Sequence, residues 1–173
     1  MKAFSLVEVA IVLMITAFLS AMFIGYNQVS QRQIALSTEQ ARVVGFLTRA
    51  KAFALERNFS VGGGDACGFG VHFPSQDKMV IFKTTPIDIN RGCETNNFGR
   101  VYGETIEEMI LDKRVRIIGS PPDIFFEPPY LTTFLNGVKL NSDFILSLSL
   151  VDGSKTALIQ IGPGGDISSG PIQ

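Results

Sequence analysis

The chain has 173 residues, a formal net charge of −1 and two cysteines. This length suits one ordinary domain with an added segment, and the balanced charge excludes an overall basic surface that would attract nucleic acid. Apolar residues are concentrated in the first two dozen positions, whereas Gly, Pro and Asn clusters separate short apolar runs beyond residue 25. We therefore predict an apolar N-terminal segment followed by an α+β domain.

Residues 4–24 form the apolar run FSLVEVAIVLMITAFLSAMFI. As an α-helix this run would be about 31 Å long, enough to cross a hydrocarbon core of about 30 Å. A secretory signal has a shorter apolar core and a small-residue cleavage site, and Leu19-Ser20-Ala21 matches such a site poorly. A plain signal-anchor helix, with Lys2 keeping the N-terminus in the cytoplasm, is the alternative.

Glu8 places an acid inside this membrane-length run. Such an acid costs on the order of 2.5–3.5 kcal/mol and usually has a partner and a role. Cleavage of the chain after residue 3 would create an α-amino group on Phe4, about 6 Å from Glu8 along a helix. Glu8 of one subunit would then pair with the amine of a neighbour, and repetition of this contact between two different surfaces builds an open filament.

The sequence KAFSLVE at residues 2–8, followed by an apolar helix, resembles the class III signal of type IV pilins and pseudopilins. The resemblance implies that a prepilin peptidase cuts after Ala3, where the family usually has glycine, and methylates the new amine of Phe4. It also implies assembly through Phe4 and Glu8. The implied partners are homologous pilin or pseudopilin subunits, an inner-membrane assembly platform and membrane lipid.

Apolar positions continue at near-helical spacing from residue 25 to residue 58. We predict one long helix, with Gly25 as a soft point where many pilins have proline; two helices with a joint are the alternative. The predicted organisation is a leader at 1–3, a transmembrane half-helix at 4–24, an amphipathic half-helix at 25–58 and a β-rich head at 59–173.

The head contains short strand-like runs separated by turn residues. We expect strands at residues 68–73, 78–84, 107–112, 114–118, 123–127, 131–135, 143–151 and 156–162. Prolines on both sides of 123–127 predict an edge strand there, and the Gly- and Ser-rich tail 162–173 is expected to be loosely ordered. The fold class is therefore a long N-terminal helix packed on an antiparallel sheet. The order of these runs, and the ending IGPGGDI at 161–167, resemble the GspH/FimT group of minor pilins.

Cys67 and Cys93 lie in a head that the resemblance places in an oxidising compartment. We favour a disulfide between them, which would contribute on the order of 3 kcal/mol. Two unlinked thiols are the alternative. We expect no zinc or other metal, because a set of four ligands is missing from the sequence.

The sequence predicts no catalytic site and no cofactor. His72 is the only histidine and has no nucleophile or carboxylate partner evident in the sequence. The glycines at 62–64 lack the Lys-Ser/Thr of a phosphate loop and follow a helix rather than a strand. The basic run of Lys113, Arg114 and Arg116 is interpreted as a solvated strand face, so we do not expect nucleic acid as a partner.

We therefore expect a structural subunit, a minor pilin or pseudopilin, of a type IV pilus or a type II secretion pseudopilus. It would insert once in the bacterial inner membrane with its head outside the cytoplasm, and then join the filament. The alternatives are a DNA-binding or adhesive minor pilin, and a membrane-anchored extracytoplasmic domain with an unrelated role.

Overall fold

The computed structural model describes residues 6–58, 67–84, 103–128 and 130–173, without the side chains of residues 24–29, 57 and 58. The chain is α+β, as expected from its composition. It divides into two compact units, Met1–Ile34 and Ala35–Gln173.

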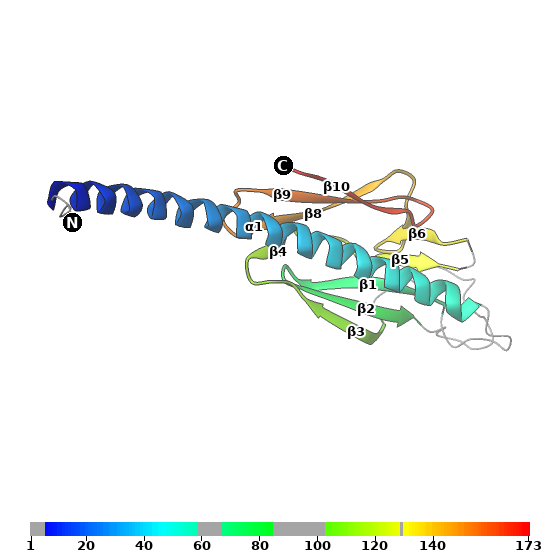
Figure 1. Ribbon diagram of the computed structural model, residues 1–173. Helices are drawn as coiled ribbons and strands as arrows, with labels where there is room; N and C mark the ends of the chain where they lie inside the picture. The colour runs from blue at the N-terminus through cyan, green and yellow to red at the C-terminus, as the bar shows by residue number, and fades with distance from the viewer. Residues whose placement is uncertain (1–5, 59–66, 85–102, 129) are drawn as a thin grey trace, which may run out of the picture. The chain divides into compact units, whose positions relative to one another are not determined.

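The described residues contain one helix and ten strands (Figure 1). The elements are α1 (Leu6–Asn58), β1 (Gly68–Ser75), β2 (Lys78–Thr84), β3 (Glu104–Ile110), β4 (Val115–Ile117), β5 (Ile124–Glu127), β6 (Thr132–Leu135), β7 (Val138–Lys139), β8 (Phe144–Leu150), β9 (Thr156–Ile161) and β10 (Ile167–Ile172).

The strands of the second unit form two antiparallel sheets. The larger sheet has six strands in the order β3-β2-β1-β5-β6-β7, and the smaller has four in the order β10-β9-β8-β4. Alternating apolar and polar residues set the register of β8 and β9, where Leu146 pairs with Ile159 and both side chains are buried. Asn136 and Gly137 both have positive φ, 46° and 80°, which suits the tight turn between β6 and β7.

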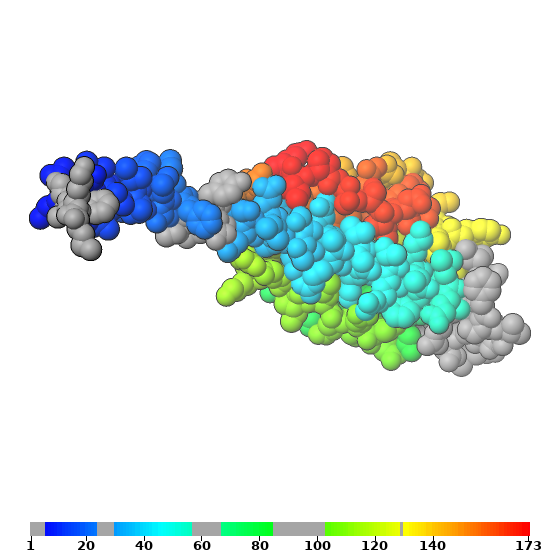
Figure 2. All heavy atoms as spheres, in the orientation of Figure 1, coloured from blue at the N-terminus to red at the C-terminus, as the bar shows by residue number. Residues whose placement is uncertain are grey.

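One hydrophobic core joins α1 to both sheets in this unit. The helix contributes Leu36, Val43, Phe46, Leu47, Ala50 and Ala54, which recur at helical spacing. The sheets contribute mainly aliphatic residues from β1, β2, β4, β5, β8 and β9. Figure 2 shows that the outer surface of this part of α1, coloured cyan, runs between the green strands of the larger sheet and the red strand β10.

The opposite face of the six-stranded sheet has a core of its own, made by Phe82, Phe125 and Phe134. The ring centroids of Phe82 and Phe125 are 6.2 Å apart, and the ring planes are inclined by 28°. They lie against β1 where it has glycine: a Cβ on Gly68 would come within 2.5 Å of the Phe125 ring, and one on Gly70 within 2.6 Å of the Phe82 ring. Glycine is therefore required at both positions of β1 by close packing.

The prediction that residues 123–127 form an edge strand is wrong. β5 lies inside the larger sheet, where Phe126 pairs with Phe69 of β1 on one side and with Thr133 of β6 on the other. The flanking prolines fall outside Ile124–Glu127, so they remove no backbone donor from either ladder.

The prediction of a loosely ordered tail is also wrong. Residues Ile167–Ile172 form β10, which pairs with β9 from Ile167 opposite Ile161 to Ile172 opposite Ala157. The register shifts after Ser169, and Gln40 of α1 bonds the backbone at this irregularity. Its Nε2 donates to the carbonyls of Leu158 (2.8 Å) and Gly170 (2.9 Å).

Candidate functional site

The segment Leu6–Phe23 is long and apolar enough to cross a membrane. Its mean hydropathy is 2.4 over 18 residues, and none of it is buried within the structure. Its large side chains project outward, from Val9 at 47% exposed to Leu6 at 85%. A surface of this kind is stable when lipid or protein covers it, because it leaves far more apolar area in water than soluble domains tolerate.

Two of the three polar side chains in this segment are satisfied inside the helix. Thr16 Oγ1 donates to the carbonyls of Val12 (2.9 Å) and Leu13 (3.0 Å), and Ser20 Oγ donates to the carbonyl of Thr16 (2.7 Å). In hydrocarbon, where no water is available, such bonds to the helix backbone remove most of the penalty of a hydroxyl.

Glu8 is the third polar side chain and differs from the other two. It lies in the first turn of α1, is exposed, and has no hydrogen bond or ion pair to any residue that the structure describes. The positive end of the helix dipole stabilises an acid at this position. For an exposed side chain, this stabilisation is at most about 1 kcal/mol. This is smaller than the penalty that an unpaired acid would have in a bilayer, so the predicted partner of Glu8 stays a prediction.

The remaining residues of the predicted assembly site are only partly described. Ala3 and Phe4 lie outside the described residues, so cleavage, methylation and the ion pair to Glu8 stay predictions. Gly25 falls within α1, and its predicted softness stays a prediction as well.

Cys67 is disulfide-bonded and buried immediately before β1. The sequence has one other cysteine, Cys93, which lies outside the described residues. The Cys67–Cys93 pairing therefore stays a prediction. Among the described residues, no group of three His, Cys, Asp or Glu side chains is placed to hold a metal ion.

His72 has a carboxylate partner that the sequence did not reveal. Its Nδ1 lies 2.7 Å from Oδ1 of Asp123, 51 residues further along the chain. Asp123 is fixed in turn, because its backbone N–H donates to Asn136 Oδ1 and its carbonyl accepts from Asn136 N–H. This partner was not evident in the sequence, because it is the pairing of β1 with β5 that brings the two residues together. The three residues form a network that joins β1 to the β6–β7 turn.

The basic run is partly neutralised by its own neighbour. Arg114 donates from Nε and Nη2 to the two carboxylate oxygens of Asp112, both at 2.9 Å, and its backbone N–H also donates to Asp112. The side-chain bond to Arg114, followed by the backbone bond, holds the pKa of Asp112 well below its usual range. The same bond raises the pKa of Arg114. Lys113 and Arg114 therefore lie in an exposed turn, and only Arg116 lies on a strand, so the expected solvated strand face is limited to Arg116 of β4.

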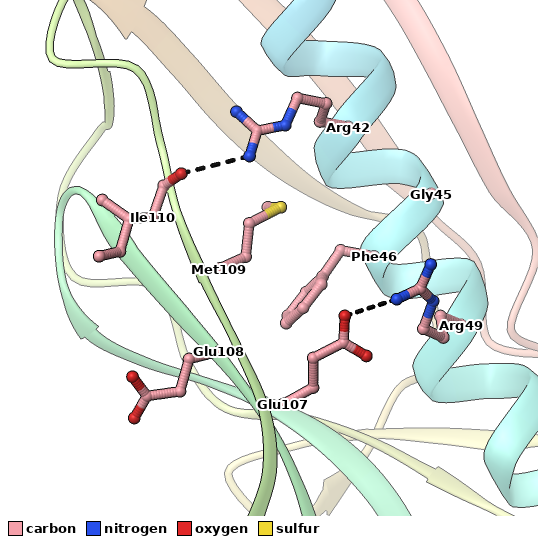
Figure 3. Close-up of a pocket in the computed structure, with 8 residues that line it drawn as sticks. All are labelled: Arg42, Gly45, Phe46, Arg49, Glu107, Glu108, Met109 and Ile110. Atoms are coloured by element: carbon pink, nitrogen blue, oxygen red, sulfur yellow. Dashed lines mark hydrogen bonds and ion pairs between the residues drawn. The ribbon is translucent and has the colours of Figure 1, made fainter.

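A groove of about 470 Å³ lies between α1 and β3 (Figure 3). The groove is lined by Arg42, Gly45, Phe46, Arg49, Glu107, Glu108, Met109 and Ile110. Arg49 Nη1 pairs with Glu107 Oε1 at 2.5 Å, and Arg42 Nη2 donates to the carbonyl of Ile110 at 3.4 Å. Sequence analysis missed this groove because its two walls are about 60 residues apart in the chain and neither carries a local motif.

Comparison of the chain with protein-family models, with curated proteins and with solved structures finds no match. The resemblance to pilins therefore depends on residues 2–8 and on the order of the elements that follow them.

Proposed function

We propose that the chain is a filament subunit of the type IV pilin class, a minor pilin or pseudopilin of a type IV pilus or a type II secretion pseudopilus. The observation that carries the proposal is Glu8. It is an exposed acid in a membrane-length apolar helix whose hydroxyl groups are already bonded to the helix backbone.

In this proposal Glu8 pairs with the α-amino group of Phe4 on a neighbouring subunit, after prepilin peptidase has removed residues 1–3. The pair offsets part of the penalty of holding each charge in lipid, whereas a misplaced subunit leaves both charges unpaired. The pair joins two different surfaces of the subunit, so it propagates along a filament. Glu8 thereby selects the register at which a new subunit enters.

The chain would cross the bacterial inner membrane once and place its head outside the cytoplasm before assembly. A disulfide at Cys67 supports this location, because disulfides persist in oxidising compartments. The partners would be homologous subunits, prepilin peptidase, the assembly platform and lipid. The role is structural, with no enzymatic step and no cofactor.

The intact mass of the mature protein, purified from a host that contains a prepilin peptidase, tests the proposal. We expect the loss of residues 1–3, one methyl group on the amine of Phe4, and two hydrogens fewer than the reduced chain. A mature protein that still begins at Met1, in cells that assemble it normally into filaments, would contradict the proposal.

A membrane-anchored domain with an unrelated role is the second candidate, favoured by the division of the chain into two compact units. In that case Leu6–Phe23 is only an anchor and any apolar helix would replace it. Exchange of this segment for a polyleucine helix of equal length separates the two candidates. The filament proposal requires the exchange to abolish assembly, whereas an anchor would keep its function.

A further inference from the structure

The outer edge of β3 has backbone groups without a strand partner in the described part of the chain. β3 is the last strand on its side of the six-stranded sheet. Leu111 N–H donates to the carbonyl of Asp77 across the β2–β3 ladder (2.8 Å). Antiparallel strands alternate, so Met109 and Glu107 also direct their backbone groups to β2, while Glu108 and Ile110 direct theirs away. The contact of Ile110 with Arg42, on the side away from β2, agrees with this assignment.

The groove between α1 and β3 runs along this edge. In Figure 3, Phe46 and Met109 lie between the contacts of Arg42 with Ile110 and of Arg49 with Glu107. The middle of the groove is therefore apolar, and its two ends are polar.

Gly45 keeps the helix wall of the groove open. A Cβ at this position would meet no atom within 4 Å, so packing does not require glycine. Glycine inside a helix is less favourable than alanine by about 1 kcal/mol. The missing side chain instead leaves room beside the free edge of β3.

The other face of the same edge is also apolar. Ile110 is 64% exposed and Ile106 is 41% exposed. Ile110 lies on the face of β3 that points away from Met109, since neighbouring residues of a strand alternate, and Ile106 lies at the bulge of the strand. An exposed edge with apolar side chains favours the addition of another strand.

The charges of β3 determine which strand fits. Glu104 pairs with Lys83 and Glu108 pairs with Lys78, both from β2, and each acid is still more than half exposed. A second copy of β3 paired about Glu108 would bring this acid opposite its own copy, which is unfavourable. A basic residue opposite Glu108 would repeat, from the free side, the contact that Lys78 makes from β2.

We propose that the outer edge of β3 and the adjoining groove bind an extended segment of a different protein, added as a further strand of the six-stranded sheet. Every second side chain of the segment is apolar and lies over Phe46 and Met109. The side chains between them include a Lys or Arg opposite Glu108 and a β-branched residue, such as Thr, beside Ile110. This mode of recognition combines main-chain hydrogen bonds with pockets for alternate side chains. The inference goes beyond the filament role and does not depend on it.

The test uses the full chain in detergent micelles and a fluorescent peptide, acetyl-TVKVTVT-amide, measured by anisotropy. We expect saturable binding that weakens by about tenfold or more in Gly45→Leu, where the new side chain fills the groove. Ala52→Leu, also on the exposed side of α1 but outside the groove, is the matched control and should bind like the wild type. Thermal unfolding checks that neither variant is less stable than the wild type.

Two peptide variants test the mode of binding. N-methylation of alternate peptide nitrogens removes donors for the β3 edge and should abolish binding, and a peptide with Glu in place of Lys should bind more weakly. Absence of binding by the parent peptide, or binding that is unaffected by Gly45→Leu or by N-methylation, would overturn the proposal. A dimer of the chain that dissociates in Gly45→Leu would also overturn it, by assigning the edge to a second copy.

Discussion

Gln40 of α1 donates a hydrogen bond of 2.9 Å to the carbonyl of Gly170, 130 residues further along the chain. The same Nε2 donates to Leu158 on the neighbouring strand. One buried amide therefore holds both sides of the β9–β10 ladder where its register shifts. This contact fastens the last strand of the fold to the helix.

Replacement of Gln40 by Met keeps the size of the side chain and removes both donors. We expect a loss of about 1–3 kcal/mol in the free energy of unfolding, because two carbonyls lose their buried partner. Hydrogen exchange should become faster in β10 before it does so in β8. Gln160→Met is the control, since Gln160 is exposed and bonds only Asp143 among the contacts seen here. Equal exchange in β8 and β10 would contradict the assignment.

Local patterns were sufficient where strands pair with near neighbours in the sequence. The β1–β2 hairpin follows from two apolar runs around a short turn, and the β8–β9 hairpin follows from alternating apolar residues. β10 could not be predicted in this way, because Ser168, Ser169 and Gly170 have little strand propensity of their own. Its order comes from β9 and from Gln40, which no local window contains.

The candidate sites, too, could be predicted from the sequence only where their signal is local. Glu8 is evident from the sequence because an acid stands out in an apolar run, whereas the His72–Asp123 pair requires the β1–β5 register. The groove beside β3 needs the position of α1 on the sheet. Contacts between distant segments thus account for what sequence reasoning missed.

Replacement by alanine should have opposite effects on the free energy of unfolding at Gly45 and at Gly70. Gly45→Ala should raise the free energy of unfolding by about 0.5–1 kcal/mol, because the helix gains propensity and the new methyl group meets nothing. Gly70→Ala should lower it by roughly 1–3 kcal/mol, since its Cβ would lie 2.5 Å from the Ile124 carbonyl and 2.6 Å from the Phe82 ring. Urea unfolding followed by circular dichroism measures both, and equal effects would contradict the packing described for β1.

The Asp112–Arg114 pair should make stability depend on pH in the acid range. Because the pKa of Asp112 is lower in the folded chain than its ordinary 3.8, the stabilisation is fully present above 3.8 and is lost as the pH falls through the folded pKa. Asp112→Asn should therefore destabilise the chain slightly at pH 7 and less at pH 3. The effect is small because water screens an exposed pair. In a chain that already carries Arg114→Gln, the effect of Asp112→Asn on stability should depend much less on pH. An unchanged pH dependence would exclude Arg114 as the cause.

Because Cys67 is disulfide-bonded, we expect substitution of either cysteine to lower the stability by the same amount. If Cys93 is the partner, Cys67→Ser, Cys93→Ser and the double variant should each lose about 3 kcal/mol of stability under oxidising conditions. Addition of a reductant should bring the wild type to the same stability. A double variant that is much less stable than either single variant would show that the two residues act separately.

Glu8→Val separates assembly from insertion. Removal of the acid makes Leu6–Phe23 more apolar, so membrane insertion should be kept or improved. Incorporation into filaments should fall by about tenfold or more, because the α-amine of the neighbour is left without its counter-charge in lipid. Thr16→Val is the control: it removes a hydroxyl that bonds only its own helix and should leave incorporation unchanged. Filaments that contain Glu8→Val at the wild-type level would show that the acid plays no part in assembly, and the proposed register contact would then be rejected.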